Sequence, residues 1–510
     1  MPEYLRALVV VVCLAAPTLW LLRQPALAFG IAPADYQRRR NVWLALTVLS
    51  FLAHSFWIYL AVAAWMLALA GAKDGHRLGL YLFVLFAIPP FWQEVPGFGV
   101  VNYLVEMTHA RLLALVVLLP AYLQLRARPG TPGFGSMWAD RFLLGYLLLQ
   151  IGLQGMVDTA TNTMRFAFYT FVDVFLPFYV ASRSLRDLEA CRDALASLLV
   201  AALVMAPIAA FEYAKHWLLF ATVPGALGVQ FGMGNYLSRG DSLRALASTG
   251  HSIILGYVMA IAIAFYGYAH AFLSNRRVAA LLLGVLLIGL YAPVSRGPWM
   301  GAAAGFVLML LTGPNKMSRI GKVIAIGIPV AVGLAFSPFG EKLIDLLPFV
   351  GTVDDFNVTY RQRLFEVSMQ VMWLHPVFGS FDYLSAPVMQ EMVQGEGIID
   401  MVNTYLSIAL SYGLVGLGLF VAVFLAAVFG VARGIWLHAS GSEMQDLGRA
   451  LLAAMVGVLI TIATVSSILI VPTVYWVLAG LCSGYGVLAA RARAAEGAYP
   501  SHYAERGWAA

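Results

Sequence analysis

Charged residues are scarce in this sequence. Only 11% of its 510 residues are Asp, Glu, Lys or Arg, whereas soluble domains contain about 25%. Hydrophobic residues make up 61% of the chain, and the mean hydropathy is +0.81. Such a chain cannot cover its surface with polar side chains in water. The composition therefore predicts an integral membrane protein, and it excludes a soluble secreted enzyme, a nucleic-acid-binding protein and a disordered chain.

Cysteine and nucleotide-binding motifs are also lacking. Cys13, Cys191 and Cys482 are far apart in the sequence, so we expect neither a disulfide framework nor a Cys/His zinc site. The sequence contains no Walker loop and no glycine-rich dinucleotide motif, and Asp354 and Asp355 are adjacent rather than spaced. These absences argue against a nucleotide-sugar donor, and we expect no cofactor and no bound metal ion.

Long hydrophobic runs dominate what is present. A spanning helix needs about 20 apolar residues. Runs that approach or exceed this length occur at 4–22, 42–71, 78–92, 110–125, 142–154, 167–182, 194–213, 251–273, 278–294, 299–313, 321–337, 404–432, 449–468 and 470–490. They predict an all-α polytopic integral membrane protein with about 12 to 14 transmembrane helices. We expect the first run to be a retained helix and not a cleaved signal peptide.

The distribution of positive charge predicts the orientation of the chain. More than half of the 32 Lys and Arg residues lie in one set of alternate loops and in the C-terminal tail, which the positive-inside rule assigns to the cytoplasm. The run at 42–71 is either one tilted helix or two helices hinged near His54 and Ser55. A cytoplasmic Arg38-Arg39-Arg40 cluster favours the hinged pair.

With this orientation, the chain divides into six transmembrane, loop and tail segments. They are N-terminal transmembrane helices in 1–213, an outer loop at 214–250, central transmembrane helices in 251–337, a large periplasmic loop at 338–403, C-terminal transmembrane helices in 404–490 and a cytoplasmic tail at 491–510. Long loops of this kind are usually functional. Within the large loop, apolar residues recur at helical spacing between Tyr360 and Trp373, which predicts a short amphipathic helix near the membrane surface.

Arginines on the outer face are candidate ligands for phosphate. Arg296 stands between two apolar runs, Arg244 precedes the helix expected at 251, and Arg361 and Arg363 open the amphipathic segment. A guanidinium group matches phosphate oxygens in two-pronged geometry, so these residues could hold a lipid pyrophosphate. Alternatively, each reaches phospholipid headgroups or pairs with an acid. The flanks of Arg296 leave it little freedom to reach water, which favours the phosphate interpretation there.

Three other titratable residues have two interpretations each. Asp173 lies within an apolar run and is either functional or a structural partner for a hydroxyl or an arginine. Glu212, at the outer end of its helix, either pairs with an outer arginine or is a solvated interfacial acid. His251 begins a helix at the outer face, where it either acts as a base or caps the helix.

Four ordered segments carry a family resemblance. They are Arg244-Ala245-Leu246-Ala247-Ser248-Thr249-Gly250-His251, Ser295-Arg296-Gly297-Pro298-Trp299-Met300-Gly301, Tyr360-Arg361 running to His375-Pro376-Val377-Phe378-Gly379, and Asn403-Thr404-Tyr405-Leu406 followed by Gly413-Leu414-Val415-Gly416. In this order and with the large outer loop, the chain resembles the O-antigen ligase and O-antigen polymerase superfamily of bacterial envelope polysaccharide enzymes.

The resemblance implies a reaction and its partners. Such enzymes move a glycan from undecaprenyl pyrophosphate, in the outer leaflet of the inner membrane, to a sugar hydroxyl without ATP or metal. By motif matching, Arg296, Arg361 and Arg244 would stabilise the leaving pyrophosphate from the periplasmic side, with Arg363 as a further ligand. The implied partners are an undecaprenyl-pyrophosphate-linked oligosaccharide and membrane lipid. A chain-length regulator and a flippase are further candidates.

One departure from the family pattern concerns the base. Many ligases have a histidine directly before the Asn-Thr pair, where this sequence has Val402. Either Asp400, Glu366, His251 or Glu396 serves as the base, or none is needed. The missing histidine favours a polymerase of repeat units over a ligase that transfers glycan to a lipid core or a protein. A lipid-linked glycan transporter or flippase is the third alternative, although no internal repeat is visible.

Overall fold

Helices make up most of the computed structural model, which describes residues 1–99, 101–229, 238–239, 242–313, 316–335, 355–394 and 397–498. Within these ranges, nine helical segments are long and apolar enough to cross a membrane. They are Glu3–Leu21 (α1), Phe56–Lys73 (α4), His109–Ala127 (α6 to α7), Ala160–Ser184 (α9 to α10), Leu188–Lys215 (α11), Ser252–Phe272 (α13 and a 3₁₀ turn), Thr404–Leu437 (α20), Glu443–Ile462 (α21) and Val471–Ala495 of α22. The predicted all-α polytopic membrane class is confirmed.

The remaining elements complete the bundle. The longer helices are α3 (Pro33–Leu52), α8 (Trp138–Val157), α14 (Arg276–Tyr291), α15 (Arg296–Thr312), α16 (Lys316–Ala335) and α18 (Asp355–Leu374). The short ones are α2 (Arg23–Phe29), α5 (Arg77–Val84), α12 (Val223–Leu227) and α19 (Pro387–Gln390), and α22 as a whole covers Val471–Ala498. Two antiparallel pairs of strands are present, β1 (Trp92–Pro96) with β2 (Tyr103–Thr108), and β3 (Ser238–Arg239) with β4 (Ser242–Leu243).

The two helices of the 42–71 run are hinged, as the positive charge at its start predicts. Helix α3 ends at Leu52 and α4 begins at Phe56. Between them His54 has a φ of 51°, a left-handed conformation that does not continue a helix. Arg39 of the basic cluster is fully buried, where its guanidinium group pairs with Asp74 at 2.7 Å and Asp193 at 2.9 Å.

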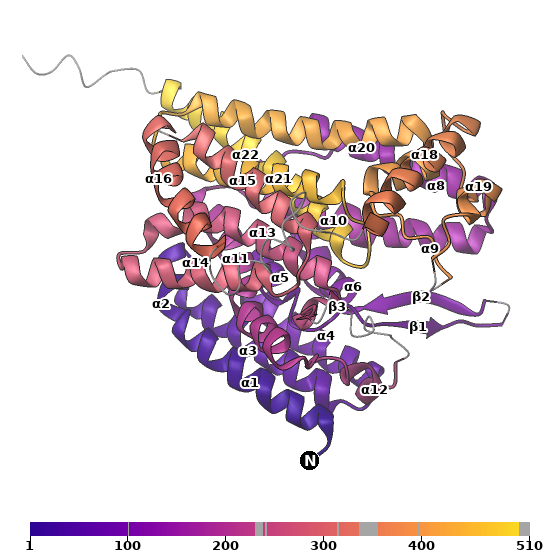
Figure 1. Cartoon of the computed structure of the whole chain (residues 1–510), viewed down its shortest axis with the longest axis horizontal. Coiled ribbons are helices and arrows are strands. Elements are labelled where there is room, and N and C mark those ends of the chain that lie inside the picture. Colours follow the sequence, from indigo (N-terminus) through magenta and orange to yellow (C-terminus); the bar gives the residue numbers. More distant parts are fainter. Residues whose placement is uncertain are drawn as a thin grey trace, which may run out of the picture.

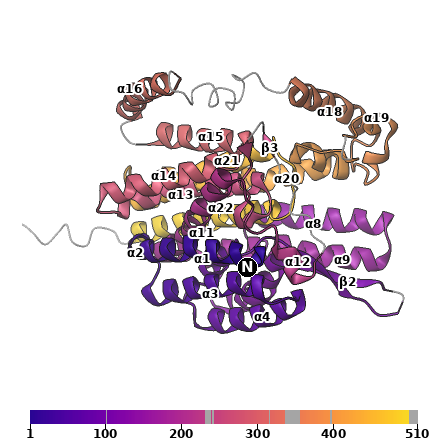
Figure 2. The ribbon, with the colours of Figure 1, turned by 60° about the horizontal axis from the view of Figure 1, so that its bottom comes forward.

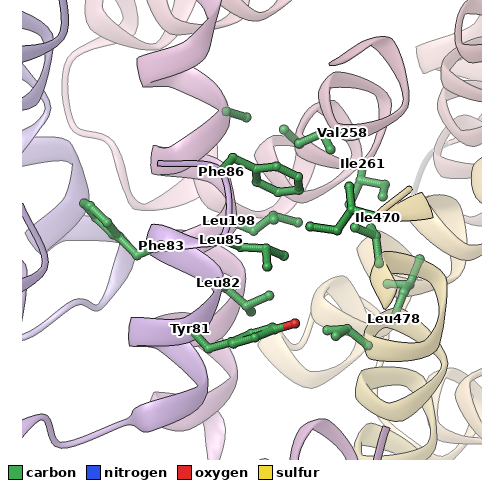
Figure 3. Close-up of a cluster of buried hydrophobic side chains, with 14 of the residues drawn as sticks. Tyr81, Leu82, Phe83, Leu85, Phe86, Leu198, Val258, Ile261, Ile470 and Leu478 are labelled. Carbon is green, nitrogen blue, oxygen red and sulfur yellow. The ribbon is translucent and has the colours of Figure 1, made fainter. Parts of the chain in front are cut away.

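The predicted spanning helix at 78–92 is wrong. Helix α5 has only eight residues, and the chain from Leu85 onward leaves the helix and continues into β1. Figure 3 shows why this run is so apolar: Tyr81, Leu82 and Leu85 lie within a cluster to which α11, α13 and α22 also contribute side chains. The run fills the centre of the bundle, and burial on all sides gives the same hydropathy as a membrane span.

The hairpin of β1 and β2 was not expected from the sequence. It extends beyond the ends of the neighbouring helices (Figure 1). The register pairs Trp92 with Thr108. Arg165 of α9 fastens it to the bundle, because its Nε donates to the carbonyl of Leu104 at 3.0 Å and its guanidinium group lies over the Tyr103 ring.

Helix α18 confirms the predicted helix in the large loop, whose first part up to residue 354 lies outside the described residues. Leu364, Val367 and Val371 are buried in a cluster with Met389 of α19 and Leu410 of α20. Its apolar face therefore packs on neighbouring elements. Figures 1 and 2 show α18 and α19 together beside one end of α20.

Candidate active site

Glu212 holds the segment that contains Arg244 and His251. This acid is fully buried near the end of α11. Its carboxylate accepts the backbone N–H groups of Leu219 at 3.0 Å, Leu246 at 2.9 Å and Ala247 at 2.7 Å. The sequence suggested that Glu212 either pairs with an outer arginine or is exposed to water. Both interpretations are wrong, because its carboxylate is buried and its partners are backbone N–H groups. The carboxylate fixes the turn that leads from Arg244 to α13.

The Arg244 segment runs beside the segment that precedes Arg296. The Ala245 N–H donates to the Ala292 carbonyl, and Arg244 Nε donates to the Pro293 carbonyl, both at 3.2 Å. Arg296 follows as the first residue of α15, after Ser295 as its N-cap. The structure therefore brings two of the predicted arginine segments together. Both arginines are half-buried.

Glycines fix the position of α15, and with it that of Arg296. A Cβ on Gly297 would lie 2.6 Å from Thr464 Oγ1, and one on Gly305 would lie 2.9 Å from the Ala453 carbonyl oxygen. A Cβ on Gly301, between them, would collide with α21. Small residues at such spacing let two membrane helices approach closely. Helix α15 is therefore held against α21 along its length.

The turn at 463–470, between α21 and α22, joins the remaining site segments. Arg361 Nη2 donates to the Thr464 carbonyl at 3.4 Å. Ser466 Oγ donates to Asp400 Oδ1 at 2.8 Å. Because Gly297 packs against the same Thr464, the turn lies between Arg361 and the residue that follows Arg296. We call the end of the bundle that carries this turn the site end.

The start of α20 is fastened to the same turn. Asn403 caps the helix by accepting the N–H of Leu406 at 3.1 Å, and Thr404 Oγ1 donates to the Val465 carbonyl at 2.8 Å. The predicted helix start at Asn403-Thr404 is confirmed. Asp400 lies just before this cap and is exposed, so its carboxylate is accessible at the site end.

Two further motif segments form one unit. Helix α20 is broken at Gly413, where φ is 66° and ψ is −171°. The N–H groups of Leu414 and Val415 then donate to the Pro376 and Val377 carbonyls at 2.8 and 3.2 Å. The His375–Gly379 segment thus supplies the acceptors that the broken helix lacks, since buried backbone groups need partners. This contact fixes α18 relative to α20.

His251 is a neutral N-cap. Its Nδ1 accepts the Ile253 N–H at 3.2 Å, so its proton belongs on Nε2. Burial, together with the positive charge of Arg244, lowers the pKa of His251 to about 4. The histidine is therefore a weak base at neutral pH. The geometry supports the capping interpretation.

Arg363 and Glu366 lie apart from these contacts. Arg363 pairs with Glu366 at 3.4 Å and with Glu391 at 3.1 Å, on the exposed side of α18. Glu396, the other candidate base, lies outside the described residues. Asp173 pairs with Arg111 at 2.9 Å in a π-helical turn, which fits its interpretation as a structural partner.

Sequence reasoning missed Thr464 and Ser466. Both lie in a stretch of Thr and Ser residues that separates two apolar runs, and the composition resembled the end of a span. The stretch Thr461–Ser467 contains four hydroxyl residues, and that density was the available signal.

Comparison with known families agrees with the motifs. Residues 279–421 match a family model described as O-antigen ligase. Three of the four motif segments lie in this region, whereas Arg244–His251 precedes it and the 463–470 turn follows it. A search of curated proteins found no match to the chain. The resemblance to the O-antigen ligase and polymerase superfamily is confirmed over residues 279–421 of this multi-pass membrane protein.

Proposed function

We propose that this protein polymerises bacterial exopolysaccharide or O-antigen repeat units on the periplasmic face of the inner membrane. The donor is a glycan on undecaprenyl pyrophosphate, and the acceptor is a sugar hydroxyl. The hydroxyl oxygen forms a bond to the anomeric carbon while the bond from that carbon to the pyrophosphate oxygen breaks. The lipid pyrophosphate leaves and the hydroxyl proton passes to a base, without a metal ion.

The convergence of arginine segments at the site end is the observation that carries this proposal. Arg361 contacts the 463–470 turn directly, and Arg296 precedes the glycine that packs on it. Arg244 is hydrogen-bonded to the segment before Arg296. A departing pyrophosphate gains negative charge in the transition state, and preorganised guanidinium groups stabilise such charge.

A largely apolar cavity, with His270, Asp446 and Arg449 in its lining, offers room for the lipid tail. It has a volume of about 650 Å³ and lies between α13, α14, α15 and α21. On α15 its wall includes Gly301, Ala302 and Phe306, which follow Arg296 within three turns of helix. A donor with its pyrophosphate at Arg296 could therefore place part of its polyprenyl chain in this cavity.

Asp400 is the base that the geometry favours. It is exposed at the site end and is oriented by Ser466, whereas Glu366 is already paired with Arg363. His251 is too weak a base because of its low pKa. In this proposal Asp400 receives the proton of the attacking hydroxyl.

The first experiment is to incubate the purified protein with a lipid-linked repeat unit, without nucleotide or metal, and to separate the glycans on a gel. A ladder of regularly increasing glycans supports the polymerase. Single transfer, only when a lipid core or a protein acceptor is added, indicates a ligase despite Val402. Movement of the repeat unit across a vesicle membrane without reaction overturns the enzyme proposal and indicates a transporter.

Variants of the arginines test the site. Arg296→Ala and Arg361→Ala should each reduce kcat by about 10²- to 10³-fold, the usual effect of removing one donor to a developing anion. Arg296→Lys should recover little activity, because Lys keeps the charge but cannot donate two parallel hydrogen bonds to phosphate oxygens. Lys215→Ala is the control, since it removes an exposed positive charge at the end of α11 that carries Glu212. Wild-type rates in both alanine variants would refute the assignment.

A further inference from the structure

An arginine-lined cleft lies at the end of the bundle opposite to the site. Two cavities of about 250 and 220 Å³ adjoin each other there, and Arg128 and Arg186 line both of them. Arg77 also lines the first cavity. Arg491 also lines the second, as does Arg183, whose guanidinium group is paired with Asp140 at 2.6 Å. These residues come from segments far apart in the sequence, so only the fold creates the cleft.

Helix α22 defines the distance from the proposed active site. It begins at Val471, directly after the 463–470 turn, and Arg491 lies 20 residues further along. At a rise of 1.5 Å per residue this separation is about 30 Å, the thickness of a membrane core. Arg491 Nη2 donates to the Gly130 carbonyl at 3.2 Å, which ties the end of α22 to the loop after α7. The cleft and the proposed active site therefore face opposite sides of the membrane.

The positive charge of the cleft is poorly balanced. Among the described residues that line the two cavities, Asp74 is the only acid. Its carboxylate is already used by Arg39, which pairs with it at 2.7 Å. Arg77 is anchored by its Nε, which donates to the Gly71 carbonyl at 2.9 Å, while its buried Nη1 has no hydrogen-bond partner among the described residues.

The start of α5 adds favourable backbone dipoles. The first turn, Arg77 to Gly79, lines the larger cavity, and the N-cap residue His76 makes no side-chain cap hydrogen bond. Unsatisfied N–H groups and the positive end of the helix dipole favour an anion at such a position. Guanidinium groups and a helix start thus point to the same type of ligand.

We propose that this cleft, lined by Arg77, Arg128, Arg186 and Arg491, binds a phosphate-bearing ligand on the membrane face opposite to the active site. Basic pockets between membrane helices on this side suit phosphate headgroups of anionic lipids, and a soluble phosphate ester offers the same chemistry. Because two cavities share Arg128 and Arg186, a ligand with two phosphate groups would contact all four arginines. This site is separate from the proposed catalytic function.

The test compares two double variants of the full-length protein in neutral detergent. Arg128→Gln/Arg186→Gln removes the shared arginines, both of which are exposed, so folding should be retained. Arg276→Gln/Arg277→Gln is the matched control, because it removes two exposed arginines from the start of α14 at the same end of the bundle. Binding of inorganic pyrophosphate is measured in the detergent, binding of cardiolipin is measured after reconstitution into phosphatidylcholine nanodiscs, and thermal unfolding verifies the fold.

Pyrophosphate can also bind at Arg296 and Arg361. The readout is therefore the difference in binding affinity between the cleft variant and the control variant. We expect the cleft variant to bind at least one probe about 30-fold more weakly than wild type, as expected for two arginines near phosphate. The control should remain within about twofold. Loss of cardiolipin alone identifies a lipid headgroup, and loss of pyrophosphate alone a soluble ligand. Equal affinities in the two variants, or no binding of either probe by wild type, would overturn the proposal.

Discussion

Glu212 Oε2 accepts the backbone N–H of Ala247 at 2.7 Å, although 35 positions separate the two residues in the sequence. Ala247 has a φ of 47°, a conformation that is strained for a residue other than glycine. The buried carboxylate offsets this strain by accepting several N–H groups at once. It therefore determines how the chain passes from Arg244 to the N-terminus of α13.

The first prediction concerns Glu212→Gln. The amide keeps one acceptor oxygen but places a donor NH₂ group against a backbone N–H. Leaving a buried donor unsatisfied costs about 1–3 kcal/mol, so we expect a lower thermal unfolding temperature. The turn should also loosen, and kcat should fall because Arg244 is no longer held in place.

Glu189→Gln is the matched control for this change. It makes the same substitution in the first turn of the same helix, at an exposed position. The control should unfold and react as wild type does. An unfolding temperature for Glu212→Gln equal to that of the control would show that the carboxylate does not hold the turn.

The second prediction concerns the contact between α15 and α21. Gly301→Ala places a Cβ against Thr461 and the Gly457 backbone, so the two helices must separate. Overpacking of this kind costs about 1–3 kcal/mol, and it should also displace Arg296 five residues earlier. Gly327→Ala in α16 is the control, because nothing lies within 4 Å of a Cβ there. Thermal unfolding and glycan synthesis should both decline in Gly301→Ala alone.

Much of the fold could be predicted from periodicity and hydropathy. The hinge at His54 was favoured by the positive charge at 38–40, the helix between Tyr360 and Trp373 by its apolar spacing, and the helix start at Asn403 by the family motif. The run at 78–92 could not be predicted correctly. Its side chains are surrounded by protein, and hydropathy cannot distinguish protein from lipid as the surroundings.

The candidate site could be predicted only in part. The arginine segments were visible in the sequence because Arg is unusual in short outer loops. The turn that gathers them was not, because Thr464 contacts Arg361 from 103 positions away. The role of Glu212 was equally hidden, since its partners are backbone groups and any sequence can supply an N–H.

The third prediction concerns Asp400 and Ser466. Asp400→Asn should abolish most of the activity if the carboxylate accepts the proton of the attacking hydroxyl, while unfolding should change little because the residue is exposed. Ser466→Ala should reduce kcat less, since it removes only the hydrogen bond that orients the acid. If Ser466 acts only by orienting Asp400, the double variant should be no less active than Asp400→Asn alone. Additive losses would indicate two independent roles.

The fourth prediction concerns the pH dependence of stability. The pKa of His251 is lowered to about 4 by burial and by Arg244, whereas an unfolded histidine titrates near 6.5. As the pH falls, the unfolded chain therefore binds a proton at this histidine at a higher pH than the folded protein does. The stability contributed by neutral His251 is present above about pH 6.5 and is lost as the pH falls toward 4. We expect the unfolding temperature of the wild type to decline across this interval.

His251→Asn isolates the contribution of this residue. Asn can still cap α13 by accepting the Ile253 N–H, but it does not titrate. The variant should lose part of the decline between pH 6.5 and 4, whereas His270→Asn, at an exposed position beyond the other end of α13, should retain it. If His251 were instead the general base, His251→Asn would abolish activity at pH 7. Retained activity together with a flatter pH profile of stability would establish that His251 caps the helix and leaves the proton transfer to another group.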